Sequence, residues 1–149
     1  MSNVSKPTVL IVPGAWHVPK HFEPLAEKLR HVEYHTVTLS LPSVGGDPPI
    51  DTFDEDVQVI SNAVREIADA RAECIVVLHS YAGVPGSEAL QGLSKQERSA
   101  AGKPGGVVAI VFLSSFILLE GQRLFNPGQV NPPHWEIQVR DSEEVTVLT

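Results

Sequence analysis

Cysteine is nearly absent from this sequence. Cys74 is the only one, so the sequence offers no disulfide framework and no metal site built from several cysteines. It begins an apolar run, where a buried structural thiol is expected rather than a nucleophile. A chain without disulfides is typical of a reducing compartment, and we predict a soluble, cytoplasmic protein.

Long apolar runs and excess basic charge are lacking as well. The apolar run before Pro13 is shorter than the core of a secretory signal. The longest run, 107–119, contains two serines and falls short of the roughly 20 residues that span a bilayer. With 11 basic and 18 acidic residues, the chain has no surplus positive charge to bind nucleic acid or an anionic membrane. Neither is expected as a partner.

Metal and cofactor sites are not indicated either. His17 and His21 are four residues apart, as are His31 and His35, which would suit a metal if each pair lay on one helix. Pro19 interrupts the first pair, and the second spans a predicted helix end and strand start. The paired glycines lack the spacing of phosphate-binding loops. We predict no metal and no cofactor.

The 149 residues, 42% of them hydrophobic, suffice for one globular domain with a buried core. Apolar runs alternate with amphipathic segments. Strands are predicted at 8–14, 34–42, 74–79 and 105–115, and helices at 20–30, 52–71, 81–93 and 94–102. Because strands that alternate with helices form parallel sheets with right-handed crossovers, we expect an α/β fold.

Two details concern the ends of these elements. Thr52 and Glu55 have the spacing of a capping box at the start of the second helix. Beyond residue 120 the periodicity ends, apart from a short strand predicted at 145–148. The C-terminal segment therefore reads as a loop-rich excursion.

Two turns follow predicted strands: PGAWH (13–17) and HSYAG (79–83). Ligands of parallel sheets bind beyond the carboxyl ends of the strands, near the point where strand order reverses. If the first and third strands are neighbours, the two turns face each other there.

Ser80 lies at the corner between the third strand and the next helix, in CIVVLHSYAGVPGS (74–87). A serine on such a corner is the nucleophile elbow, whose pattern G-x-S-x-G requires small neighbours. Ala82 and Gly83 meet this requirement, whereas Leu78 is bulky where the pattern has glycine. The alternative is that Ser80 only caps the helix. The paired PGAWH turn (13–17) and the small residues that follow Ser80 favour the nucleophile.

An oxyanion formed at Ser80 would need two amide donors. Tyr81 follows the serine and supplies one amide at the start of a helix, where negative charge is stabilised. Ala15 is placed to supply the other, because Gly14 allows close approach of the backbone. Trp16 and His17 would then line the substrate pocket together with Gly14, or simply fill the loop.

VLIVPGAWH followed by VVLHSYAG resembles the small α/β-hydrolases related to plant methyl-salicylate-type esterases and hydroxynitrile lyases, together with uncharacterised fungal hydrolases. The resemblance covers about residues 8–125. It implies a parallel α/β-hydrolase core of about four strands over residues 1–118 and the start of a cap at 119–149. It also implies that Ser80 is the nucleophile, that the amides of Ala15 and Tyr81 form the oxyanion hole, and that His79 is structural.

The family's catalytic triad runs Ser, Asp, His along the chain. Downstream of Ser80 the sequence has only His134 and Asp141 of these types, in reversed order, and Glu120 falls where the family has its cap entrance. A solvated loop histidine is the simpler account of His134. We therefore expect a C-terminally truncated hydrolase core without an identified general base or acid.

The sequence as a whole predicts a carboxylesterase-like serine hydrolase that acts on a small ester, with activity impaired by the missing triad members. A non-catalytic binding module and a hydroxynitrile-lyase-type enzyme remain as alternatives. The strand at 107–113 would form an open apolar edge of the sheet, and such edges associate with other strands. Self-association through this edge is expected.

Overall fold

The computed structural model describes residues 5–124 and the backbone of two further strands, β5 (Trp135–Arg140) and β6 (Glu143–Leu148). Contacts divide the chain into two units, Met1–Ile117 and Leu118–Thr149. Within the described ranges, no helix has the length and apolar character to cross a membrane.

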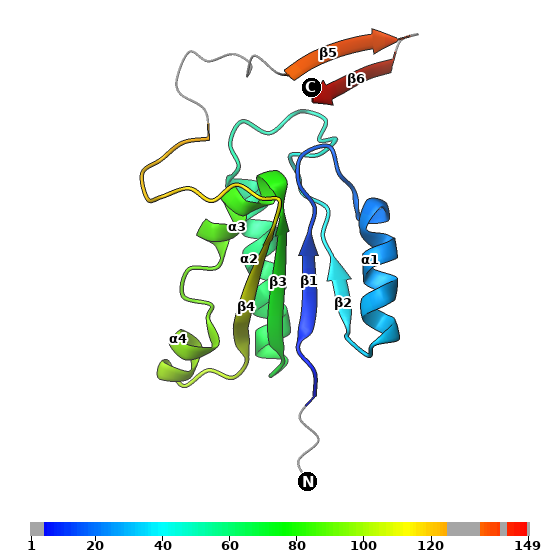
Figure 1. The fold of residues 1–149 in the computed structure, drawn as a ribbon. Coiled ribbons are helices and arrows are strands. Elements are labelled where there is room, and N and C mark those ends of the chain that lie inside the picture. Colours follow the sequence, from blue (N-terminus) through cyan, green and yellow to red (C-terminus); the bar gives the residue numbers. More distant parts are fainter. Residues whose placement is uncertain (1–4, 125–134, 141–142, 149) are drawn as a thin grey trace. The chain divides into compact units, whose positions relative to one another are not determined.

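The first unit is built on a parallel sheet of four strands in the order β2-β1-β3-β4 (Figure 1). The strands are β1 (Thr8–Val12), β2 (Thr36–Thr38), β3 (Glu73–His79) and β4 (Gly106–Leu113). The chain passes from β1 to β2 on one side and then to β3 on the other, so strand order reverses between β1 and β3. The predicted α/β class and parallel sheet are confirmed.

Helices cover the two faces of this sheet unequally. They are α1 (Pro19–His31), α2 (Asp54–Asp69), the 3-10 turn η1 (Ser80–Ala82), α3 (Gly83–Ala89) and α4 (Lys95–Ala100). Residues of α1 pack in one hydrophobic cluster, and residues of α2 and α3 pack in another. Two faces are filled because successive side chains of a strand point to opposite sides.

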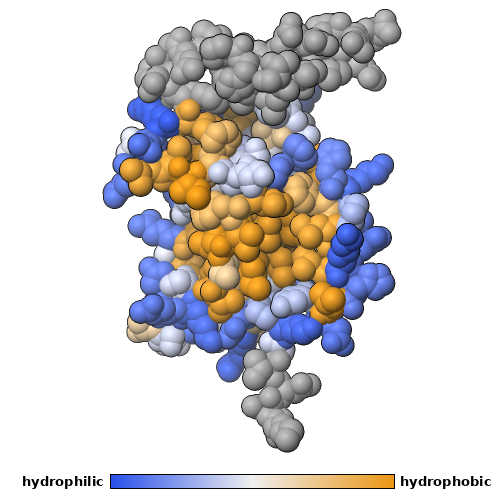
Figure 2. All heavy atoms as spheres, viewed as in Figure 1, coloured by the Kyte–Doolittle hydropathy of each residue, from blue (hydrophilic) through white to orange (hydrophobic). Residues whose placement is uncertain are grey.

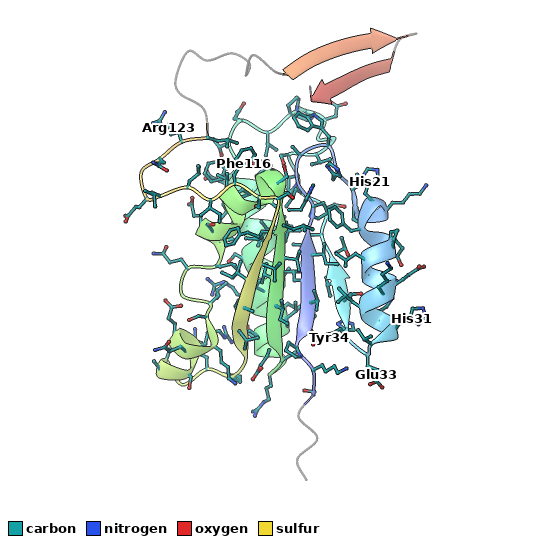
Figure 3. All side chains as sticks on the ribbon, in the orientation of Figure 1. His21, His31, Glu33, Tyr34, Phe116 and Arg123 are labelled. Atoms are coloured by element: carbon teal, nitrogen blue, oxygen red, sulfur yellow. The ribbon has the colours of Figure 1, made fainter. Side chains whose placement is uncertain are left out.

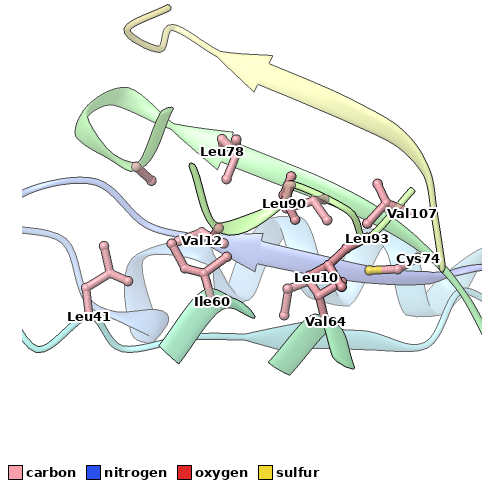
Figure 4. Close-up of a cluster of buried hydrophobic side chains, with 13 residues drawn as sticks. Leu10, Val12, Leu41, Ile60, Val64, Cys74, Leu78, Leu90, Leu93 and Val107 are labelled. Carbon is pink, nitrogen blue, oxygen red and sulfur yellow. The ribbon is translucent and has the colours of Figure 1, made fainter. Parts of the chain in front are cut away.

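The larger cluster lies between the sheet and the helices α2 and α3 (Figure 4). Leu10 and Leu78 from the strands and Ile60 and Val64 from α2 are fully buried in it. Burying a leucine or valine side chain stabilises a fold by about 1.5–3 kcal/mol. This cluster therefore fixes the ends of β1 and β3, from which the two predicted turns emerge.

The opposite face carries a smaller cluster in which Phe22 and Ala26 of α1 pack on Val9, Ile11 and Val77. Apolar side chains form a broad area over the sheet on the face seen in Figure 2. β4 is an edge strand, and both of its faces are exposed. Its large apolar residues from Val108 to Leu113 are each 36–45% exposed.

Several predicted ends are wrong. β2 is shorter than predicted, and the helix predicted at 81–93 stops at Ala89, with Leu90 as its C-cap and Gly92, whose φ is 72°, in the turn that follows. No capping box forms at Thr52, because α2 takes Phe53 as its N-cap and the Thr52 hydroxyl pairs with Asp54 instead. In the second unit, β5 and β6 form an antiparallel pair, of which only the second strand was predicted.

Candidate active site

Ser80 takes a backbone conformation that a serine rarely adopts. Its φ is 52°, in the left-handed region, which costs an L-residue about 1–2 kcal/mol. β3 ends at His79, and η1 begins at Ser80. The junction is thus a sharp strand-to-helix corner with the serine at its apex.

Leu78 fits at this corner because Gly86, on α3, has no side chain. Leu78 is fully buried, and a Cβ added at Gly86 on α3 would overlap its Cδ1 and Cδ2 atoms. The space that the usual elbow pattern obtains from a small residue before the serine is supplied here by Gly86. The departure from G-x-S-x-G is therefore accommodated by packing.

The two predicted turns lie against each other. The Gly14 N–H donates a hydrogen bond to Nδ1 of His79, 3.2 Å away. A Cβ at Gly14 would lie 2.7 Å from the His79 carbonyl oxygen and 2.8 Å from the Ser80 Cβ. Only glycine tolerates such an approach. Adjacent β1 and β3 thus bring Gly14 beside Ser80, and Ala15 follows Gly14 in the same turn.

His79 joins the turns and belongs to a cluster of rings. Its ring centroid lies 4.8 Å from that of His17 and 5.1 Å from that of Phe22. Burial lowers the pKa of His79, and the neighbouring His17 lowers it further. Because Nδ1 accepts the Gly14 bond, the neutral ring carries its proton on Nε2. His79 is half-buried rather than fully buried.

His17 and Trp16 continue the first turn. Nδ1 of His17 donates to the Ala15 carbonyl, 2.8 Å away. Trp16 has a φ of 61° and is 47% exposed. These contacts shape the turn that contains Ala15.

Tyr81 is tied to a residue that sequence reasoning missed. Its hydroxyl donates to Oδ2 of Asp56 at 2.8 Å, and Oδ1 of Asp56 accepts the Ser43 N–H at 3.0 Å. Burial, together with the bond to Asp56, raises the pKa of Tyr81. Asp56 is fully buried. Asp56 lies four residues before Ile60, on the apolar stripe of α2. An acidic residue at such a position was the signal that could have identified it.

The segment after β4 also contacts the elbow. The Ser80 carbonyl accepts hydrogen bonds from the Phe116 N–H at 3.1 Å and from the Ser115 hydroxyl at 2.8 Å. A Cβ at Gly83 would overlap the Phe116 carbonyl oxygen. Phe116 lies at the carboxyl end of the strands, beside α3 (Figure 3). Sequence reasoning saw Ser115 only as an interruption of an apolar run.

A general base is not among the residues brought together. Within residues 5–124, no hydrogen bond reaches the Ser80 hydroxyl. His134 and Asp141 lie outside the described residues. Glu120 is exposed and belongs to the second unit.

The rings of His17 and His21, one of the two candidate pairs, lie 5.4 Å apart between centroids, but a metal site needs at least a third ligand. In the part of the chain that the structure describes, no group of three His, Cys, Asp or Glu side chains could hold a metal ion. His21 and His31 lie at opposite ends of α1 (Figure 3). Burial raises the pKa of the Cys74 thiol to about 11, which leaves it protonated and unreactive.

Comparisons with known proteins agree with this arrangement. The alpha/beta hydrolase family profile matches residues 9–145. The chain is 34% identical over 127 residues to the alpha/beta hydrolase nvfD of Aspergillus novofumigatus, covering 85% of this chain and 49% of that protein. It is 31% identical over 121 residues to "Probable hydrolase R7" of a Phoma species, covering 80% of this chain and 46% of that protein.

The chain thus spans about half the length of the curated relatives that it matches. The finer likeness to methyl-salicylate-type esterases stays a prediction. The parallel sheet, the strained serine corner and the matched profile lead to one assignment: this chain belongs to the alpha/beta hydrolase family.

Proposed function

We propose that this chain carries the nucleophile and the oxyanion hole of a serine hydrolase that acts on small esters or related acyl compounds. The observation that carries the proposal is the positive φ of Ser80 at the end of β3, with Gly14 packed against it. A serine in such a turn presents its hydroxyl at the top of the sheet.

The reaction would proceed through an acyl-enzyme. The Ser80 oxygen bonds to the acyl carbon while its proton passes to a general base, and the alcohol leaves with that proton. Water then attacks the same carbon, which releases the acid and restores the hydroxyl. Negative charge develops on the carbonyl oxygen in both steps, and amide donors would stabilise it there.

Ala15 and Tyr81 are the proposed donors. They lie in two turns that the hydrogen bond from Gly14 to His79 holds together. Tyr81 belongs to the first turn of η1, where backbone N–H groups have no partner within the helix. Gly14, Trp16 and His17 would line the substrate pocket.

The general base is unassigned. Without one, a serine hydroxyl is a weak nucleophile, and loss of a triad member in a serine protease costs up to about a million-fold in turnover. We therefore propose that hydrolysis by this chain alone is impaired, while Ser80 still reacts with strong electrophiles.

Labelling with a fluorophosphonate tests the proposal. The Ser80 oxygen would displace fluoride from phosphorus, and mass spectrometry of the digested protein would locate the adduct. We expect slow labelling at Ser80 that is lost in Ser80→Ala and retained in Ser99→Ala, a control at an exposed serine of α4. Equal labelling of Ser80→Ala and wild type would overturn the proposal.

Labelling, together with two further measurements, separates two alternatives. A non-catalytic binding module would not be labelled, but small esters would raise its melting temperature. This alternative is favoured by the absence, within residues 5–124, of a base bonded to Ser80. A hydroxynitrile-lyase-type enzyme would release cyanide from a cyanohydrin.

A further inference from the structure

We propose that Asp56 is a positioning residue of the candidate site. Its carboxylate accepts a hydrogen bond from the Tyr81 hydroxyl and thereby holds Tyr81, whose backbone N–H is the proposed oxyanion donor after Ser80. The inference rests on the proposed function, because it assigns a role at the same site. Asp56 itself is not proposed to touch substrate.

The surroundings of Asp56 are unusual for a carboxylate. The residue is fully buried, and its two oxygens accept from a phenol and from a backbone amide. In the described part of the chain, it forms no ion pair. Burial of an unpaired carboxylate is costly. An apolar residue at this position would stabilise the fold more than a buried carboxylate does. The carboxylate therefore indicates a specific requirement other than stability.

That requirement is found at the strained corner. A residue held at positive φ persists only when its surroundings fix it. Ser115 and Phe116 fix the carbonyl of Ser80, and His79 fixes the turn that contains Gly14. The Ser80 carbonyl and the Tyr81 N–H belong to one peptide group, and the far end of that group is the Tyr81 Cα.

Anchoring the Tyr81 hydroxyl also restrains the Tyr81 backbone. A tyrosine side chain is rigid and has only two rotatable bonds, so an anchored hydroxyl restricts the position of the Tyr81 Cα. The anchor lies in the first turn of α2, which the buried residues Ile60 and Val64 fasten to the sheet. Asp56 therefore ties the elbow to a helix whose buried face is packed on the sheet.

Substitutions at both ends of this bond test the inference. Tyr81→Phe removes the donor, Asp56→Ala removes the acceptor, and Asp56→Asn keeps the shape and one oxygen in case the alanine variant fails to fold. Glu55→Gln is the matched control, because it removes one negative charge from the same helix turn at an exposed position.

The first measurement is the rate of fluorophosphonate labelling at Ser80. We expect about a tenfold fall in Tyr81→Phe and Asp56→Ala, less than the 10²–10³ expected for complete loss of an oxyanion donor. Asp56→Asn should recover part of the rate, and Glu55→Gln should match wild type. Unchanged labelling in all four variants would overturn the inference and leave the proposed function standing.

The second measurement does not depend on reactivity. The Gly83 N–H bonds to the carbonyls of Ser80 and Tyr81, so its hydrogen exchange reports the integrity of η1. We expect faster exchange at Gly83 in Tyr81→Phe, with unchanged exchange at Val76 in β3. If wild type is not labelled but Gly83 behaves this way, the proposed function fails and the positioning role stands. Equal acceleration at both amides would indicate a merely structural role and overturn the inference.

Discussion

Single residues around Ser80 are held by contacts that come from distant parts of the chain. Gly14 is 65 residues away along the chain from His79, to which it bonds. Gly86 makes room for Leu78, and Ser115 bonds the Ser80 carbonyl. The strained serine is therefore supported from several directions, and each support can be tested separately.

The fit between Gly86 and Leu78 predicts energetic coupling. Gly86→Ala should destabilise the protein by about 1–3 kcal/mol, because the new methyl group overpacks the core against Leu78. Leu78→Ala should cost about 2–5 kcal/mol through the cavity it leaves. The double variant should cost less than the sum, since the methyl group enters that cavity. Urea unfolding of the four proteins measures the coupling, and strict additivity would contradict the contact.

His79 predicts a dependence of stability on pH. Its folded pKa lies below the ordinary value of about 6.5, so below pH 6.5 the unfolded chain binds more protons at this site than the folded chain. The free energy of unfolding should therefore fall as pH drops through this window, and the loss should stop below the folded pKa.

Urea unfolding between about pH 8 and pH 5 measures this loss. In His79→Asn, which keeps an acceptor for the Gly14 N–H, the pH dependence should be smaller than in wild type. His31→Asn, at an exposed histidine near the end of α1, serves as the control. An unchanged profile in His79→Asn would show that His79 is not the source.

At the scale of elements, apolar runs predicted the strands of the sheet, and their alternation with helices predicted its parallel order. The close approach of the two turns also followed from the sequence, because neighbouring parallel strands end at the same edge. The tie between Asp56 and Tyr81 did not, since no local pattern records which residues meet after packing. The ends of helices were missed for a similar reason: a shift of one residue moved the N-cap of α2 from Thr52 to Phe53.

The short helix α4 shows how packing stabilises an element that is too short to form alone. Arg98 is only 3% exposed, and its guanidinium donates to the Pro104 carbonyl at 2.9 and 3.0 Å and to Asp69 at 2.6 Å. The Asp69 side chain is 68% exposed, so solvent weakens the ion pair. The bonds to the carbonyl should carry most of the stabilisation.

This difference leads to a prediction for α4. Arg98→Ala should lower the free energy of unfolding by about 1.5–3 kcal/mol, the range for hydrogen bonds to a charged group. Asp69→Asn should cost less than about 1 kcal/mol, as expected for an exposed pair. Chemical unfolding of both variants makes the comparison, and equal losses would contradict the assignment.

At the scale of the whole molecule, the feature with the largest consequence is the edge of β4, which among the described residues is paired only at its start, by a bridge between Val107 and Ser94. The strand Gly106–Leu113 contains no charged residue and no proline, which are the usual means of keeping an edge from pairing. Its apolar side chains are exposed on both faces of the sheet. We propose that a second copy of the chain pairs with it, because an uncharged strand meets its own copy without opposed like charges.

Light scattering at increasing protein concentration tests this pairing. Wild type should show a rising average mass, and Val111→Lys should remain monomeric because a lysine at the edge would oppose its own copy across the pair. Val32→Lys is the matched control, since Val32 is an apolar residue that is 53% exposed outside the sheet; it should associate like wild type. A monomeric wild type at high concentration would contradict self-association, and equal loss of association in both variants would place the contact elsewhere than β4.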